Sequence, residues 1–154
     1  MPADSMRDLA TKMASLSGLE ALRAITSATE LPPNFGEHLG MRADEVEFGR
    51  VVFSILTVPH FANPLGTMHG GIYATVLDSA MGSAVHSTLE PGAGYGTLEL
   101  KVNYIRPVPT DGRRLVATGT VIHVGRTTAT AEGRMTTEDG KLVAHGTTTC
   151  IIHR

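Results

Sequence analysis

One segment, residues 72–89, constrains the fold more than any other, because it is apolar around too much of its circumference for a surface helix. Two adjacent rows at helical spacing are apolar: Ile72, Val76, Ala80 and Ala84, and beside them Tyr73, Leu77, Met81 and Val85. A helix with such a broad apolar face is buried rather than amphipathic. We therefore predict a central helix that the rest of the domain encloses and that ends before Pro91-Gly92.

The residues after this helix have the pattern of strands. Residues 97–104 alternate with period two, which predicts one face made of Leu98, Leu100, Val102 and Tyr104 and another made of Thr97, Glu99, Lys101 and Asn103. Three more strands are predicted at 115–124, 127–135 and 142–152, separated by turn signals at Gly125-Arg126 and Glu138-Asp139-Gly140.

A further strand is predicted before the helix, because residues 46–58 are rich in β-branched and aromatic side chains. We read it as one long strand bent at Gly49. The order of strand, central helix and four consecutive strands predicts an α+β fold, in which a curved antiparallel sheet wraps around the helix.

The N-terminal residues form a helical extension, which we assign to residues 1–33, with the main domain at 34–154. Two short helices are predicted there, beginning at capping boxes formed by Ser5 with Asp8 and by Ser17 with Glu20. Pro32-Pro33 ends the pattern, because proline disfavours helical geometry at the preceding residue.

Composition excludes several classes of protein. A net charge of −2 gives no reason to expect nucleic acid, and the apolar runs are far shorter than the ~20 residues that a membrane-spanning helix needs. The single cysteine, Cys150, rules out an internal disulfide and fits a cytoplasmic protein. The histidines have no metal-ligand spacing, so we predict no metal.

The loop that enters the central helix, Asn63-Pro64-Leu65-Gly66-Thr67-Met68-His69-Gly70-Gly71, is the most informative for chemistry. Amides in the first turn of a helix lack intrahelical acceptors and lie at the positive end of its dipole. They suit an anion, or a carbonyl oxygen that gains negative charge during acyl transfer. Alternatively, Gly70-Gly71 only allow the loop and helix to pack closely.

Asp78 lies within the same apolar helix, where a carboxylate is costly unless it is paired or used. Helical spacing places it on a stripe of small and polar residues that includes Gly71, Thr75, Gly82 and His86. It is a candidate general base. One alternative is an aspartate exposed to solvent. The other is a buried aspartate that bonds only to structural groups, on a stripe whose small residues serve helix–helix contact.

Gly70 and Asp78 are eight residues apart, so they lie ~12 Å apart along the helix. Groups that react with one carbonyl must approach it to ~3 Å. If both serve one reaction, they must come from different subunits. Two antiparallel copies of the helix would pair Gly70 of one chain with Asp78 of the other, which predicts a two-fold homodimer with two equivalent sites.

The motifs HGGIYATVLDSAMGSAVHS, GTLELKVNYIRPV and HVGRTTATAEGRM resemble those of the hotdog-fold acyl-CoA thioesterases, in the PaaI-like (phenylacetate-pathway) branch. The resemblance covers roughly residues 34–153. It implies that the Gly70 amide polarises the thioester carbonyl and that Asp78 acts as general base or nucleophile. It also implies that Asn63 helps to hold the thioester or water, that His69 shapes the site, and that Thr97 positions the water.

The resemblance implies hydrolysis of an acyl-CoA thioester to a free acid and coenzyme A, by a homodimer or a dimer of dimers. No cofactor is expected, since coenzyme A is part of the substrate. Arg126 and Arg106 are candidates for its phosphates, and Gly71 borders the site. The acyl group, which the sequence does not identify, has five candidate pocket residues: Phe61, Met68, Tyr73, Met81 and Tyr95. The alternatives are a non-catalytic acyl-CoA sensor and a hotdog hydratase or dehydratase.

Overall fold

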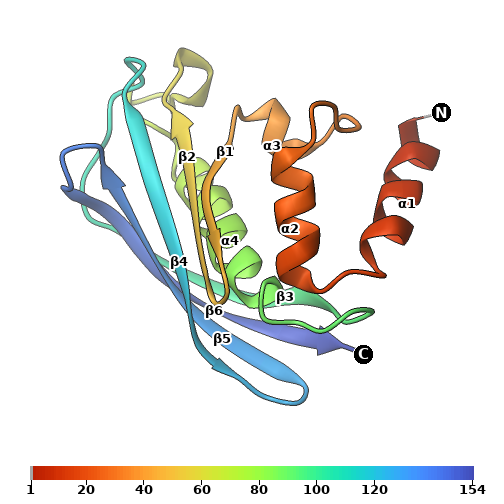
Figure 1. Ribbon diagram of the computed structural model, residues 1–154. Helices are drawn as coiled ribbons and strands as arrows, with labels where there is room; N and C mark the ends of the chain where they lie inside the picture. The colour runs from red at the N-terminus through yellow and green to blue at the C-terminus, as the bar shows by residue number, and fades with distance from the viewer. Residues whose placement is uncertain (1) are drawn as a thin grey trace.

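The computed structural model describes residues 2–154 and shows a six-stranded antiparallel sheet curled around one long helix (Figure 1). The strands are β1 (Arg42–Glu47), β2 (Arg50–Leu56), β3 (Gly94–Tyr104), β4 (Arg114–Val124), β5 (Thr128–Thr137) and β6 (Leu142–His153). Their order in the sheet is β1-β2-β4-β5-β6-β3, so β1 and β3 are the edges. The predicted α+β fold is confirmed.

The enclosed helix is α4 (Gly70–His86), and its burial follows from the two apolar rows. Every residue of the two rows is buried except Ile72, which is partly exposed. The helix packs against inward side chains of the sheet such as Leu115, Ala131 and Met135, all fully buried. Burial of so many aliphatic side chains supplies the main stabilisation of the domain.

Close contact between α4 and the sheet depends on two glycines. Gly119 of β4 and Gly133 of β5 are register partners in the middle of the sheet. A Cβ at Gly119 would lie 2.3 Å from the backbone carbonyl of Ala80, and one at Gly133 would lie 2.9 Å from Cγ of Met81. The sheet therefore presents bare backbone where the helix crosses it.

The single long strand predicted for residues 46–58 is wrong. The structure has a hairpin, in which Glu47 pairs with Arg50 and the chain reverses at Phe48-Gly49. Gly49 has a φ of +74°, a conformation that only glycine adopts without strain. Apolar residues continue through the turn. The sequence pattern therefore predicts only a bend at Gly49, whereas the chain reverses its direction there.

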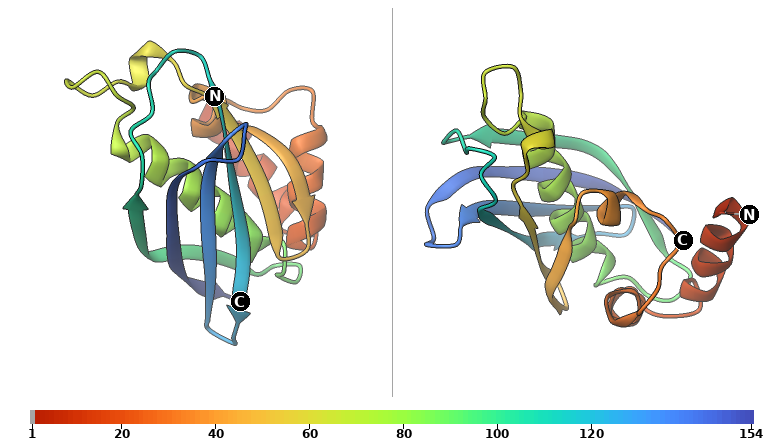
Figure 2. Two further views of the ribbon diagram at one scale, coloured as in Figure 1. Left: turned by 90° about the vertical axis from the view of Figure 1, so that its left-hand side faces the viewer. Right: turned by 90° about the horizontal axis from the view of Figure 1, so that it is seen from above.

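The N-terminal extension contains α1 (Pro2–Met13) and α2 (Gly18–Ser27), followed by the short α3 (Phe35–His38). The capping box of Ser17 and Glu20 is present, which confirms that prediction. The other predicted box is wrong, because Ser5 lies inside α1 rather than before it. Figure 1 and Figure 2 show α2 beside the edge strand β1 and α1 farther from the sheet.

The start of α2 is docked on the C-terminal end of α4. The amide of Gly18 donates to the carbonyl of Leu89 at 2.9 Å, and a Cβ at Gly18 would lie 1.7 Å from the carbonyl oxygen of His86. No side chain other than hydrogen fits there. The extension is thereby held against the body of the domain.

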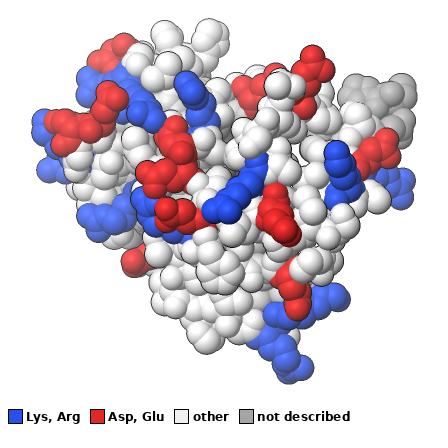
Figure 3. Space-filling model, in the orientation of Figure 1, with Lys and Arg blue, Asp and Glu red and all other residues white. Residues whose placement is uncertain are grey.

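Acidic and basic side chains are interspersed over the face shown in Figure 3, without a large area of one sign. Within residues 2–154, no helix is both long enough and apolar enough to cross a membrane.

Candidate active site

Asp78 of the central helix and Thr97 of the edge strand β3 are joined by a hydrogen bond. Asp78 lies halfway along α4 and is partly buried, and its Oδ1 accepts a hydrogen bond of 2.9 Å from Oγ1 of Thr97. Thr97 belongs to the edge strand β3, where it pairs with the buried Cys150 of β6. The bond orients one carboxylate oxygen and leaves the other available to a reactant.

A β-bulge brings Thr97 to Asp78, and it makes the predicted faces wrong for Thr97 and Leu98, whereas Leu100 and Val102 face the core as predicted. Thr97 pairs with Cys150 and Glu99 with Thr149, so Leu98 is an extra residue in β3. The insertion shifts the alternation by one, and bulges commonly re-aim side chains near active sites. Thr97 therefore faces the helix together with Tyr104, while Leu98 is 58% exposed.

His69 caps the start of α4. Its Nδ1 accepts a hydrogen bond of 2.9 Å from the amide of Gly71, so that nitrogen must be unprotonated. The side chain itself is exposed. His69 thus sets the geometry of the first helical turn. The amide of Gly71, a residue that we predict to contact the substrate, already donates its hydrogen bond to His69.

The amide of Gly70 donates to no acceptor within residues 2–154. The hydroxyl of Tyr104 donates to the carbonyl of the same residue at 3.0 Å, and a Cβ at Gly70 would lie 3.2 Å from the Tyr104 ring. His69 and Tyr104 together hold the peptide unit between Gly70 and Gly71 at both ends. The neighbouring Gly70 N–H is left as a fixed, unpaired donor at the positive end of the helix.

Tyr104 was missed as a site residue in the sequence. We had predicted it only as one apolar member of a strand face. Its ring contacts Tyr73 edge-on with centroids 5.5 Å apart. Nothing in the local sequence reveals that its hydroxyl reaches a glycine 34 residues earlier in the chain.

A cavity of about 290 Å³ lies beside the Gly70 amide. Four predicted residues line it, namely Met68, Gly70, Tyr73 and Arg106, together with Tyr104, Ile105 and Pro107. The hydroxyl of Tyr73 donates to the carbonyl of Arg106 at 3.3 Å, and burial raises the pKa of Tyr73. The guanidinium of Arg106 donates to the carbonyl of Leu142 at 2.6 Å and remains exposed.

Asn63 organises the loop before α4. Its Oδ1 accepts from the amides of Leu65 and Thr67 at 2.9 and 3.3 Å, and its Nδ2 donates to Thr67 Oγ1 at 3.1 Å. The structure therefore uses both ends of this side chain within the loop that leads to His69.

Arg126 lies far from the predicted site residue Gly70 of the same chain. It follows β4, in the turn to β5 near the C-terminal end of α4, whereas Gly70 is at the opposite end of the helix (Figure 1). Of the five candidates for an acyl pocket, Phe61, Met68, Tyr73 and Met81 are core residues.

Tyr95 is the fifth candidate, and its ring covers α4 at Gly82, where a Cβ would lie 2.7 Å from the Tyr95 hydroxyl. Burial, and to a lesser extent the charge of Asp78, raise the pKa of Tyr95 to about 12. Burial likewise raises the pKa of Cys150, which argues against a nucleophilic thiolate.

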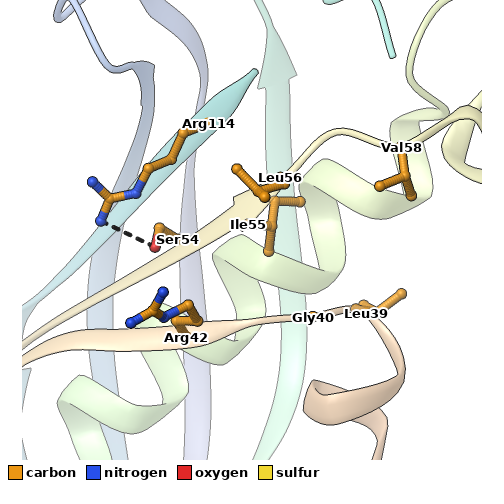
Figure 4. Close-up of a pocket in the computed structure, with 8 residues that line it drawn as sticks. All are labelled: Leu39, Gly40, Arg42, Ser54, Ile55, Leu56, Val58 and Arg114. Carbon is orange, nitrogen blue, oxygen red and sulfur yellow. Dashed lines mark hydrogen bonds between the residues drawn. The ribbon is translucent and has the colours of Figure 1, made fainter. Parts of the chain in front are cut away.

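A separate cavity of about 270 Å³ opens where β1 begins, β2 ends and β4 begins (Figure 4). Its walls are mainly apolar, with Arg42 and Arg114 beside them. Arg114 donates to Asp44 at 2.7 Å and to Ser54 at 3.3 Å, so its charge is already engaged. None of the predicted site residues lines this cavity. Over residues 2–154, no group of three or more His, Cys, Asp or Glu is arranged to hold a metal ion.

Residues 65–144 match the family model of the thioesterase superfamily. Human acyl-coenzyme A thioesterase 13 is 30% identical over 129 residues, which cover 82% of this chain and 91% of the relative. The medium/long-chain acyl-CoA thioesterase YigI of Escherichia coli is 27% identical, with coverage of 90% and 98%.

Among solved structures, a phenylacetic acid degradation-related protein of Ralstonia eutropha superposes with a TM-score of 0.75 at 28% identity. The match covers 84% of this chain and 97% of that one. The chain therefore belongs to the thioesterase superfamily, in its PaaI-like hotdog branch, and is a thioester hydrolase.

Proposed function

We propose that the protein hydrolyses acyl-CoA thioesters to a carboxylic acid and coenzyme A. One observation carries the proposal: a carboxylate oriented by Thr97 lies on the same helix as the unpaired Gly70 amide. The names of the human and E. coli relatives, both acyl-CoA thioesterases, support the substrate class. We assign the chemistry to residues 34–154.

The reaction needs a base or nucleophile and a donor to the carbonyl oxygen. As a general base, Asp78 takes a proton from water while the water oxygen bonds to the thioester carbonyl carbon. The Gly70 N–H then donates to the oxyanion of the tetrahedral intermediate. When the C–S bond breaks, the electron pair leaves with sulfur, which takes up a proton. If Asp78 is instead the nucleophile, an acyl–aspartyl anhydride forms first and water hydrolyses it.

A single chain cannot place both groups on one carbonyl, because eight residues of α4 separate them by ~12 Å. We therefore infer a homodimer in which Asp78 of one subunit meets the Gly70 amide of the other. The edge strand β3 supports this arrangement, since it is 11 residues long and its outer side pairs with no strand within residues 2–154. A dimer of dimers is compatible with the same sites.

Coenzyme A requires cations near its phosphates. Arg106 lines the cavity at Gly70 and remains exposed. In an antiparallel pair of helices, the Arg126 turn of one subunit lies on the Gly70 side of the other, so both arginines can contribute. No cofactor beyond the coenzyme A of the substrate is needed, and an acyl-CoA substrate fits a cytoplasmic location.

The test is a panel of acyl-CoAs, arylacetyl and medium-chain substrates included, assayed with a thiol reagent. We expect thiol release by the wild type, and a loss of two or more orders of magnitude in kcat in Asp78→Asn. Asp8→Asn, on the exposed side of α1, is the matched control and should keep full activity. Binding without thiol release would favour a sensor, and full activity in Asp78→Asn would reject the assignment of the base.

A further inference from the structure

A groove of about 570 Å³ lies between the N-terminal extension and the outer side of α4. One wall is formed by the end of α2 and by segment 28–37, and the opposite wall by α4 at Ser79 and Ser83. These two serines are one turn apart, so the groove follows α4 for about 6 Å. Its volume is within the range of small-molecule sites.

The lining of the groove combines apolar side chains with the uncharged polar residues Thr26, Asn34, Ser79 and Ser83, and two of its residues are charged. The aliphatic and aromatic side chains come from four separate segments of the chain and are all partly exposed: Ile25, Leu31, Met41 and Phe53. The two charged residues of the lining, Glu37 and Arg42, are exposed. Such a lining favours an occupant without charge, whose burial removes apolar surface from water.

The groove lies beside the reactive pair, although neither Asp78 nor Thr97 lines it. Ser79 directly follows Asp78 on α4, and Tyr95 lies two residues before Thr97 on the same face of β3. The Tyr95 ring is fixed against Gly82 and lies 5.6 Å from the ring of His86. Tyr95 therefore forms a rigid end wall at the side of the groove nearest Asp78.

The outer wall is bonded to the sheet through Arg23 and is ordered internally by Asn34. Arg23 of α2 donates to the carbonyl of Val46 in β1 at 3.3 and 3.2 Å. Asn34 caps α3 by accepting from the amide of Glu37 at 3.0 Å. These bonds fix the position of α2 relative to β1 and the geometry of the segment that enters α3.

We propose that this groove holds the acyl chain of the thioester, and that α2 and segment 28–37 select aliphatic chains of medium or greater length. The inference rests on the proposed function, because only a thioester carbonyl placed at Asp78 directs its acyl chain here. Each methylene that enters the groove adds to binding, whereas a chain too short to reach Leu31 gains nothing from this wall.

The test compares kcat/KM for dodecanoyl-CoA with that for butanoyl-CoA. Ala43→Phe adds a ring to the floor of the groove, and Ile25→Ala removes contacts from its outer wall. We expect the ratio of long-chain to short-chain kcat/KM to fall about tenfold or more in Ala43→Phe, and several-fold in Ile25→Ala. Ile122→Ala is the matched control, since Ile122 is 58% exposed on β4 outside the groove, and its ratio should equal that of the wild type.

A second measurement does not depend on turnover. Hydrogen exchange of segment 25–43 is followed with and without a non-hydrolysable dodecyl thioether of coenzyme A, and we expect slower exchange only with the analogue. An unchanged chain-length ratio in Ala43→Phe, with wild-type hydrolysis intact, would overturn the groove assignment and leave the proposed function standing. Absence of any acyl-CoA hydrolysis would overturn both. Protection that rises with protein concentration alone would assign the groove to a second copy of the chain and overturn the inference.

Discussion

The hydroxyl of Thr97 donates to Oδ1 of Asp78 at 2.9 Å, across the boundary between the edge strand β3 and the central helix α4. The two residues are 19 positions apart in the chain. Their contact ties the one carboxylate of α4 to the strand at which a second subunit can add to the sheet. The proposed base and the proposed dimer edge thereby meet at one point of the fold.

Removing the hydroxyl of Thr97 should impair catalysis without unfolding the protein. In Thr97→Val the carboxylate loses its fixed orientation, and we expect kcat to fall roughly 10- to 100-fold, a part of what a positioned base contributes. Thr97→Ser keeps the donor and should retain most of the activity. Steady-state kinetics on one acyl-CoA would check this, and a Thr97→Val variant as active as Thr97→Ser would contradict it.

Tyr104 should act on the reaction through the peptide unit of Gly70. In Tyr104→Phe the ring stays against Gly70 and Tyr73, but the hydrogen bond to the Gly70 carbonyl is lost. We expect a fall in kcat of about tenfold with KM nearly unchanged, because the amide serves mainly the oxyanion. A rise in KM with kcat unchanged would instead indicate a role in ground-state binding only.

The fold could be predicted largely because its central helix is unusual. The two apolar rows of residues 72–85 would be costly to expose, so this helix must be buried. The strands after it have clear period-two patterns. The hairpin at Gly49 was not predictable in the same way, because apolar residues continue on both sides of the turn. The pattern specifies burial, and the positive φ of one glycine decides the direction of the chain.

The candidate site residues could be named from the sequence, but their geometry could not. Gly70, Asp78 and Thr97 were named from motifs, yet strict alternation placed Thr97 on the wrong face of its strand. The bulge at Leu98 depends on pairing with β6, which no local pattern reveals. Tyr104 escaped for the same reason, since its partner is distant in the chain and its residue type suits an ordinary strand.

The packing of α4 on the sheet should depend on Gly119. In Gly119→Ala the new methyl group meets backbone atoms of Ala80, which cannot move aside as a flexible side chain would. We expect a loss of about 1–3 kcal/mol in the free energy of unfolding, measured by urea denaturation. Gly94→Ala is the control, because nothing lies within 4 Å of its Cβ position. Equal stability of the two variants would show that the helix is not in tight contact.

Stability should decrease in mild acid because of His86. Burial lowers the pKa of His86, and its Nδ1 is buried without a partner among residues 2–154. In the unfolded chain the pKa of a histidine is about 6.5. As the pH falls below that value, His86 therefore binds a proton in the unfolded chain but not in the native state. Stability is present above that pH and is lost as the pH decreases toward the native pKa.

Thermal unfolding at pH 7.5 and pH 5.5 would measure this effect. We expect the wild type to lose roughly 2–4 °C more in Tm than His86→Gln over this interval. His123→Gln, at an exposed position of β4, should behave as the wild type does. An identical pH dependence in the wild type and His86→Gln would remove His86 as the cause.

The central claim is that each site joins Asp78 of one subunit to the Gly70 amide of the other, and mixed dimers test it most directly. Gly70→Pro removes the N–H donor and keeps the backbone geometry, since proline is favoured at the first helical position and the extended ψ of 135° at His69 suits a following proline. Its Cβ would lie 3.2 Å from the Tyr104 ring, which must shift by a few tenths of an ångström. Dimers with Asp78→Asn in one subunit and Gly70→Pro in the other, isolated with two affinity tags, contain one intact site and one doubly altered site. We predict that they have about half the activity of the wild type, although each parent variant is nearly inactive. Mixed dimers no more active than their parents would contradict a site shared between two chains.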